Sequence, residues 1–274
     1  MSDRDTIAEL LVQLRLRGMA QALEQELERA EHQSCSPAEL LYRLLLEEDR
    51  CRRERSLENR LDQAKLPWPW TLASFPFDRQ PGLDRAQVQS LASLDFVRRA
   101  DNLVLVGPPG VGKSGIAIAL LREACLNGYR ARFYNAQDLL DELYASLADR
   151  SSAKLLNRLA RYDVLLIDEI GYLTLKPEQS NAFFKLMDQR YQRVSTIITT
   201  NLPFDDWYEL FGKKTLVDAM LDRLQHRCIT IKIDGPSLRV PEPHPEPEPD
   251  PPTTPPKKRR TSKRTPQHKS VPQA

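Results

Sequence analysis

A glycine-rich octapeptide between two apolar runs constrains this chain more than any other feature. Residues 107–114 read Gly-Pro-Pro-Gly-Val-Gly-Lys-Ser, after the apolar run 103–106 and before the helix-like run 116–121. Strand, loop and helix in this order are the context in which such a loop binds phosphate. Gly110 and Gly112 let the backbone approach an anion closely, with successive N–H groups pointing inward. The sequence therefore predicts a nucleotide-binding α/β domain rather than a plain glycine turn.

Two side chains of this loop have separate expected roles. Lys113 reaches the β- and γ-phosphate oxygens, and the hydroxyl of Ser114 ligates Mg²⁺. The helix that follows places its positive N-terminal end behind the phosphates. ATP and Mg²⁺ are therefore the expected ligands. The residues expected to hold the nucleotide are Gly107, Pro108, Pro109, Gly110, Val111, Gly112, Lys113 and Ser114.

A second apolar run ends in two carboxylates, Asp168 and Glu169, about 55 residues after the phosphate loop. Asp168 fits a Mg²⁺ ligand, acting directly or through water. Glu169 fits a general base that polarises the attacking water. Two solvated acids at a strand end are the alternative, and the preceding phosphate loop disfavours it.

Two more candidates follow along the chain. Asn201 ends the β-branched run 196–200 and could hold the lytic water by donating to the γ-phosphate, or it could simply form a turn before Pro203. Arg223 lies late in the domain, where an arginine can reach the nucleotide of a neighbouring subunit. An intrahelical contact is its alternative, and Arg227 and Arg239 compete for the same role.

Strands and helices alternate from Asp101 onward, which predicts a parallel sheet with helices on both faces and a ligand at the carboxyl ends of the strands. The expected strands are 103–106, 130–134, 163–168, 195–200 and 228–233. The expected helical segments are 113–127, 138–147, 152–160, 178–191, 204–211 and 215–226.

Residues 6–63 are expected to be helical. Ile7, Leu10, Leu11 and Leu14 share one helix face, and 36–39 form a capping box that opens another helix. An arginine-rich stretch follows and is either a DNA- or partner-binding surface or a solvated face interleaved with glutamates. It contains Arg50, Arg52, Arg53, Arg55 and Arg60.

The predicted domain organisation has four parts. A helical partner- or DNA-interaction domain spans 1–66, a linker 67–100, the ATPase core 101–240 and a disordered tail 241–274. Aromatic residues of the linker, between 68 and 77, could stack on nucleobases or pack against the core. The tail is proline-rich and then basic, and its run 257–260 could contact DNA phosphates or serve only solubility.

Charge, cysteines and hydropathy limit the remaining possibilities. The net charge is +2, and residues 241–274 hold seven basic and four acidic side chains, so the rest of the chain is nearly neutral and any nucleic-acid surface must be local. The four cysteines have no zinc-ligand spacing and suggest buried thiols in a reducing cytoplasm. No apolar run is long enough for a signal peptide or a membrane span.

These motifs together resemble the IstB-type transposition helper ATPases, a branch of the AAA+ superfamily close to the DnaC-type helicase loaders. The resemblance covers roughly residues 6–240. Beyond the phosphate loop, it depends on Leu16-Arg17-Gly18-Met19-Ala20, Ile167-Asp168-Glu169-Ile170-Gly171-Tyr172-Leu173, Gln189-Arg190-Tyr191, Thr199-Thr200-Asn201-Leu202-Pro203-Phe204 with Trp207, and Asp222-Arg223-Leu224.

The resemblance implies an ATPase that assembles on double-stranded DNA, bends it, and recruits or activates the transposase of an insertion sequence. It implies that Lys113 and Ser114 hold phosphate and Mg²⁺, and that Asp168 and Glu169 serve metal and water. Asn201 becomes the sensor and Arg223 the finger that acts across a homo-oligomer. The N-terminal helices would face the transposase or DNA.

The chain departs from the family pattern at three places. Ser114 stands where threonine is usual, Gly115-Ile116 replace His-Leu, and residues 235–239 match Gly-x-Ser-Tyr-Arg only in part. A helicase loader that engages single-stranded DNA and a replicative helicase is the nearest alternative function. A small-molecule phosphoryl transferase and an architectural protein with incidental hydrolysis are the others.

Overall fold

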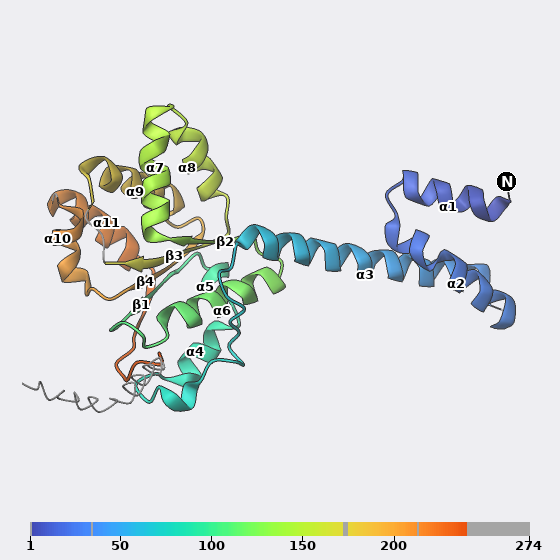
Figure 1. Cartoon of the computed structure of the whole chain (residues 1–274), viewed down its shortest axis with the longest axis horizontal. Coiled ribbons are helices and arrows are strands. Elements are labelled where there is room, and N and C mark those ends of the chain that lie inside the picture. Colours follow the sequence, from blue (N-terminus) through green and yellow to red (C-terminus); the bar gives the residue numbers. More distant parts are fainter. Residues whose placement is uncertain (1, 34, 172–174, 213, 240–274) are drawn as a thin grey trace, which may run out of the picture. The chain divides into compact units, whose positions relative to one another are not determined.

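The computed structural model describes residues 2–33, 35–171, 175–212 and 214–239 (Figure 1). The proposed tail, 241–274, with its basic run 257–260, lies outside the described residues, as do Tyr172 and Leu173 of the family motif.

A five-stranded parallel sheet forms the centre of the ATPase core, in the order β2-β3-β4-β1-β5. The strands are β1 (Asn102–Val106), β2 (Ala131–Asn135), β3 (Val164–Ile170), β4 (Ser195–Thr200) and β5 (Cys228–Lys232). The parallel sheet predicted from the β–α alternation is confirmed, and each strand lies within two residues of its expected bounds.

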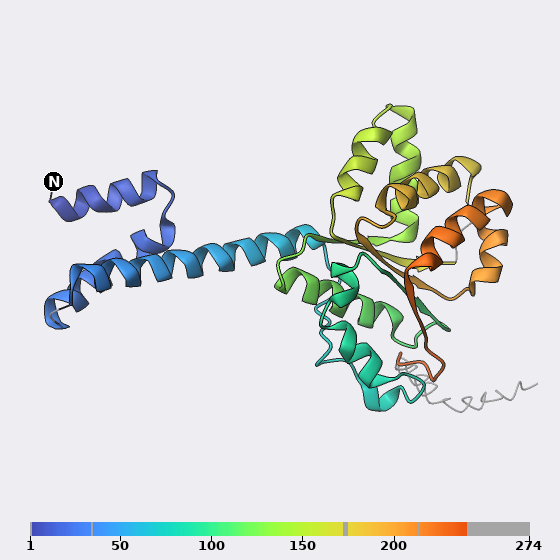
Figure 2. The same cartoon turned by 180° about the vertical axis from the view of Figure 1, so that it is seen from behind.

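Alternating side chains of the strands face two separate apolar cores. Leu103 and Leu105 point into one core and Val104 into the other, because successive residues of a strand project to opposite faces. Buried parallel strands therefore read as continuous apolar runs. Helices cover both faces of the sheet (Figures 1 and 2).

The helices divide between these two cores. The first is covered by α4 (Arg85–Leu91), α5 (Asp95–Arg98), α6 (Lys113–Leu126) and the end of α3 (Pro37–Ala64). The second is covered by α7 (Ala136–Ala148), α8 (Ser152–Ala160), α9 (Pro177–Arg190), α10 (Trp207–Phe211) and α11 (Lys214–His226), with the short 3₁₀ turn η2 (Phe204–Asp206).

The linker is more structured than its sequence suggests. It contains the 3₁₀ turn η1 (Phe77–Arg79) as well as α4 and α5, which the sequence did not predict. Helices this short have little stability of their own and form because residues such as Val88 and Phe96 are buried in the first core. Phe75 is buried there too, so this linker aromatic packs against the core.

Arg190 explains part of the family motif by packing rather than by chemistry. Its guanidinium is buried and donates to the carbonyls of Leu159, Tyr162 and Ser195 and to the hydroxyl of Thr196. Burial lowers the pKa of Arg190 to about 9. The side chain therefore ties α9 to α8 and to the start of β4.

The N-terminal region consists of α1 (Asp3–Gln13), α2 (Arg17–Gln33) and α3, as expected from its helical pattern. Of the predicted apolar face of α1, only Leu11 is buried, whereas Ile7, Leu10 and Leu14 are exposed. Leu11 packs in a small cluster with residues of α2 and α3, which are Met19, Leu23 and Leu44. The sequence therefore predicted a wider buried face than α1 has, because Leu11 alone of these four residues is buried.

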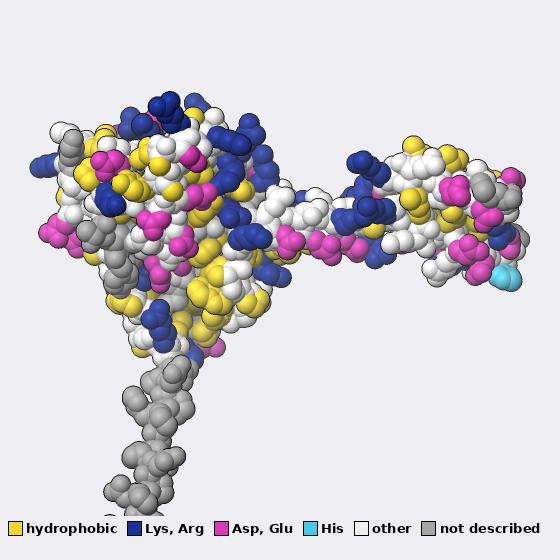
Figure 3. Space-filling view, turned by 45° about the horizontal axis from the view of Figure 1, so that its top comes forward, with side chains coloured by type: hydrophobic (Ala, Val, Ile, Leu, Met, Phe, Trp, Pro, Cys, Tyr) yellow, Lys and Arg dark blue, Asp and Glu magenta, His cyan; other side chains and the backbone are white. Residues whose placement is uncertain are grey.

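Two other N-terminal predictions are answered by side-chain contacts. Ser36 caps α3 by accepting from the Glu39 N–H, but the Glu39 carboxylate pairs with Arg43 and does not close the capping box. In the arginine-rich stretch, carboxylates of the same helix pair with the guanidinium groups of Arg50, Arg52 and Arg53. Basic and acidic side chains both line α3 (Figure 3), as in a solvated face.

Cysteines and hydropathy agree only in part with expectation. All four cysteines are free, but only Cys125 is buried, while Cys35, Cys51 and Cys228 are partly exposed. Among the described residues, none of the helices combines the length and apolar character needed to cross a membrane.

Glu48 in α3 closes the N-terminus of α2. Its buried carboxylate accepts from the N–H groups of Gly18 at 2.7 Å and Met19 at 3.3 Å, and from Arg52 Nε at 2.6 Å. Burial alone would raise the pKa of Glu48, but the three donors outweigh it and hold the pKa below its ordinary value. Glu48 therefore supplies the N-cap of α2 from a different helix.

We expect the packing of α2 on α3 to weaken in acid because of Glu48. The lowered pKa means that the ionised carboxylate stabilises the fold above the ordinary value of 4.5, and that this stability is lost as pH falls through the lowered value. Glu48→Gln should cost about 1–3 kcal/mol at neutral pH and remove this acid dependence. Urea unfolding followed by helical circular dichroism, with the exposed Glu28→Gln as control, measures both; an unchanged acid dependence contradicts the assignment.

Candidate nucleotide-binding site

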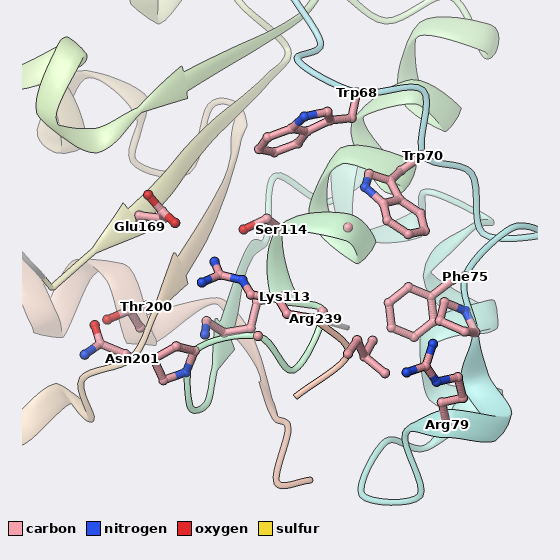
Figure 4. Close-up of a pocket in the computed structure, with 16 residues that line it drawn as sticks. Trp68, Trp70, Phe75, Arg79, Lys113, Ser114, Glu169, Thr200, Asn201 and Arg239 are labelled. Carbon is pink, nitrogen blue, oxygen red and sulfur yellow. The ribbon is translucent and has the colours of Figure 1, made fainter. Parts of the chain in front are cut away.

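A pocket of about 640 Å³ opens at the carboxyl edge of the sheet. The phosphate loop, the ends of β3 and β4, the linker and the segment after β5 all contribute to it (Figure 4). Its lining residues include Trp68, Trp70, Phe75, Arg79, Pro109, Gly110, Gly112, Lys113, Ser114, Glu169, Thr200, Asn201, Leu238 and Arg239.

The phosphate loop connects β1 to α6 as the sequence predicted. Gly110 and Gly112 have φ values of +82° and +98°, a left-handed conformation that costs glycine little. The Lys113 ammonium donates to the carbonyls of Gly107 and Pro108, each at 2.7 Å. The lysine side chain therefore curls over its own loop, where its charge would meet phosphate oxygens.

Lys113 lies in a partly buried and mixed electrostatic environment. Burial lowers its pKa; Asp168 and Glu169 act in the opposite direction, and Arg239 lowers it further. A bound anion would offset the cost of burying this cation and would reduce its repulsion by Arg239. This environment suits a phosphate site.

Asp168 lies near the carboxyl end of β3, beside the start of α6. Its carboxylate is buried, and this burial raises its pKa despite the hydroxyls of Thr199 and Ser114, which act to lower it. A buried carboxylate next to a hydroxyl is an oxygen donor set that suits Mg²⁺, and a cation there would offset the cost of burying the charge. Asp168 and Ser114 thus fit the expected metal site.

Glu169 follows in an unusual backbone conformation. Its φ is +65°, and the pairing of β3 with β4 shifts register between Ile167 and Ile170, as in a β-bulge. The bulge turns the Glu169 side chain out of the buried strand into the pocket, where it is exposed. Strain of this kind is frequent where a functional group must be aimed.

Thr199 of β4 connects the two acidic residues. Its hydroxyl donates to the Asp168 carboxylate and accepts from the Glu169 N–H at 2.8 Å. One side chain therefore fixes both the carboxylate orientation and the bulge. Sequence reasoning used Thr199 only as part of a strand and a family motif, although a polar residue at the end of a β-branched run was a usable signal.

Asn135 is a second residue that sequence reasoning missed. Its Nδ2 donates to Glu169 Oε2 at 3.2 Å, while its Oδ1 accepts from the Gln137 N–H and caps α7. The expected general base is thus held by the residue that begins a neighbouring helix. The signal was an asparagine between a strand and a helix, the usual place of an N-cap.

Asn201 lies in the pocket at the end of β4, on the same side of Lys113 as Glu169 (Figure 4). Its Oδ1 is buried and has no hydrogen-bond partner among the described residues. The structure therefore brings Asn201 to the end of the pocket that the phosphate loop lines.

Aromatic side chains of the linker form the opposite wall. Ser114 lies between Glu169 on one side and the rings of Trp70 and Phe75 on the other (Figure 4). The centroids of these two rings are 6.4 Å apart. Gly115 faces both rings, with its would-be Cβ 3.6 Å from Trp70, so the family's histidine at this position would project toward them. The wall is apolar and suited to a flat ring.

The three competing arginines lie at two edges of the sheet: Arg239 at one, and Arg223 and Arg227 at the other. Arg239 lines the pocket. Arg223 contacts Asp188 at 3.3 Å and neighbours Leu224, whose carbonyl accepts from Asn102 at the amino end of β1. A five-residue strand, roughly 15 Å long, separates that edge from the phosphate loop. Arg223 therefore cannot reach the pocket of its own chain.

Arg227 lies at the same edge as Arg223, because its guanidinium donates to the Arg99 carbonyl just before β1. Of the three arginines, only Arg239 lies at the pocket of its own chain.

The fold and the phosphate loop define a P-loop nucleotide-binding protein of the AAA+ class. The chain resembles the crystal structure of the DnaC helicase loader, with a TM-score of 0.52, 22% identity, and coverage of 62% of this chain and 99% of that one. It also resembles DnaI, with a TM-score of 0.53, 20% identity, and coverage of 60% and 91%. At these identities the likeness shows the fold.

The chain belongs to the family of IstB-like ATP binding proteins, which it matches over residues 9–244. It is 41% identical over 233 residues to a protein from Pseudomonas aeruginosa named for ATP binding in insertion sequence IS21, covering 85% of this chain and 88% of that protein. A counterpart of IS5376 from Geobacillus stearothermophilus is 35% identical, with coverage of 87% and 95%.

Thr199→Val should separate nucleotide binding from turnover. The valine keeps the shape of the strand but loses the hydroxyl that orients Asp168 and Glu169, so we expect ATP turnover to fall about tenfold or more while ADP affinity changes less than about threefold. Steady-state hydrolysis and fluorescent-nucleotide titration measure the two effects. The exposed Thr230→Val on β5 is the control, and wild-type turnover in Thr199→Val contradicts the role.

Proposed function

We propose that this chain is an ATPase that assembles on double-stranded DNA in its ATP-bound form and recruits or activates the transposase of an insertion sequence. Hydrolysis then resets the assembly. The observation that carries the proposal is the division of the candidate catalytic residues between two edges of the sheet, with Glu169 and Asn201 at one and Arg223 at the other. Relatives named for insertion sequences support the transposition setting.

The chemistry of hydrolysis follows from the pocket. Lys113 and the loop amides bind the phosphates, and Arg239 adds positive charge beside them. Ser114 and Asp168 would hold Mg²⁺, which when bound neutralises the charge on the transferred phosphoryl oxygens. The linker aromatics are placed to contact the base of ATP.

Glu169 is the proposed general base. Its exposed carboxylate faces Ser114 across the pocket (Figure 4), where it can take the proton of an attacking water. Asn201 would orient that water by donating from its amide. Asn135 donates to this carboxylate and holds it in place.

The N-terminal helices are the proposed transposase-facing part. Four large side chains of α3 are about half exposed or more, namely Leu41, Tyr42, Leu45 and Leu46. Apolar side chains gathered on one helix favour a protein partner over a DNA backbone. The ion pairs of the arginine-rich stretch support the same choice, because they already offset those positive charges.

Sedimentation of the purified chain tests the proposed function directly. We expect a large assembly only with ATP and duplex DNA together, and small species with ADP or with single-stranded DNA. Glu169→Gln should lower turnover by about a hundredfold or more and leave the duplex-bound assembly stable. A preference for single strands would favour a helicase loader, and wild-type turnover in Glu169→Gln would remove its role as the base.

Arg223 should act across a subunit contact. Arg223→Ala is expected to lower turnover by at least about a hundredfold while the monomer binds ATP with unchanged affinity. Mixing Arg223→Ala with Glu169→Gln should recover part of the activity, since some contacts then combine an intact arginine with an intact glutamate. Arg227→Ala, at the same edge, tests the competing arginine in the same way, and we expect it to leave turnover nearly unchanged. No recovery on mixing would contradict a role in trans.

A further inference from the structure

The segment after β5 runs alongside the phosphate loop. We call residues 233–239 the C-terminal strap. Its Ile233 N–H donates to the Val106 carbonyl at 2.8 Å, and its Leu238 N–H donates to the Gly110 carbonyl at 2.8 Å. The strap is thus bonded both to the strand before the loop and to the loop itself, and it delivers Leu238 and Arg239 into the pocket.

Gln80 joins the linker to the same two elements. Its side chain is 1% exposed, and its Nε2 donates to the Val111 carbonyl at 3.0 Å and to the Pro236 carbonyl at 3.1 Å. The fit against the strap is tight, because a Cβ on Gly235 would lie 1.7 Å from Gln80 Oε1. Only glycine at position 235 allows this approach.

These bonds determine which way the loop amides point. A trans peptide is flat, so its N–H points away from its C=O. The Gly110 carbonyl accepts from Leu238, and the Val111 N–H of the same peptide therefore points away from the strap backbone. By the same argument, the bond from Gln80 to the Val111 carbonyl turns the Gly112 N–H away from Gln80. Two successive N–H groups aimed one way form an anion-binding nest.

We propose that Gln80 is a positioning residue of the nucleotide site, which clamps the phosphate loop to the C-terminal strap so that its amides face the phosphates. Gln80 touches no phosphate itself. The proposal rests on nucleotide binding in this pocket, as in the proposed function, and adds a consequence: bound nucleotide and a docked strap stabilise each other, because each favours the same loop conformation.

Loss of the Gln80 donor should weaken nucleotide binding more than it slows chemistry. In the full chain, Gln80→Met keeps the length of the side chain but removes both hydrogen bonds. We expect the Kd for MgADP and the KM for ATP to rise about tenfold, with kcat changed less than about threefold. Gln89→Met, on the exposed face of α4, is the matched control and should bind like the wild type.

Strap docking supplies a readout that a purely structural role of Gln80 would not change. Amide exchange of peptides covering the strap should slow on adding MgADP to the wild type, and this protection should largely disappear in Gln80→Met at the same nucleotide concentration. Leu238→Pro removes the other donor, to the Gly110 carbonyl, without altering Gln80, and should also raise the Kd; Leu238→Ala, which keeps the N–H, is its control. This pair keeps the test decisive should Gln80→Met fold poorly.

Wild-type affinity for MgADP in a folded Gln80→Met overturns the proposal alone, and so does equal binding by Leu238→Pro and Leu238→Ala. A wild-type chain that binds no nucleotide would sink the proposed site and this proposal together. A chain that binds MgADP but does not assemble on duplex DNA would contradict the proposed function. The role of Gln80 would then still be decided by the Kd values of the variants.

Discussion

The pairing of β4 with a parallel strand on each side is the constraint on which the site depends. β1 leads into the phosphate loop, β3 carries the acidic pair near its carboxyl end, and β4 lies between these two strands. The register pairs Val106 and Ile170 with Thr200, so polar groups at the end of β4 lie between phosphate and carboxylates. The bulge at Glu169 departs from this regular pairing, and the Thr199 hydroxyl that accepts its N–H stabilises the departure. The strained Glu169, the proposed base, is therefore held by the same strand that spaces the site.

Much of this arrangement could be predicted from the sequence, because its causes are local. Apolar runs and the loop between 103 and 121 predict β1 and α6 by themselves, and parallel topology then brings the ends of β1, β3 and β4 to one edge. Asp168, Glu169 and Asn201 follow because each ends a strand. The linker helices α4 and α5 were missed, since their stability comes from burial of Val88 and Phe96 in a core that the sequence around them does not reveal.

Contacts between distant segments account for the other omissions. Gln80 lies 31 residues before Val111 and 156 residues before Pro236, so no spacing rule connects them. Pro236 lies in the segment that matches the family pattern only in part, and it has no N–H to donate. In the structure it offers its carbonyl to Gln80, and the neighbouring Leu238 supplies the donor to the loop. Arg190 is a similar case, since a conspicuous arginine in a family motif proves to be a buried tie between helices and a strand.

The separation of Arg223 from the pocket has a consequence for assembly. In such an assembly, the amino edge of the sheet in one subunit would contact the carboxyl edge of the sheet in the next. The two surfaces differ, so the contact would be heterologous. Such contacts close into rings or continue as helical filaments and do not stop at a symmetric pair. Every interior subunit would then both complete a neighbour's site and have its own site completed. ATP at this contact would be part of the interface between subunits, together with the phosphate loop that Gln80 contacts. Hydrolysis would therefore weaken the interface and loosen the assembly, and would not merely consume a ligand.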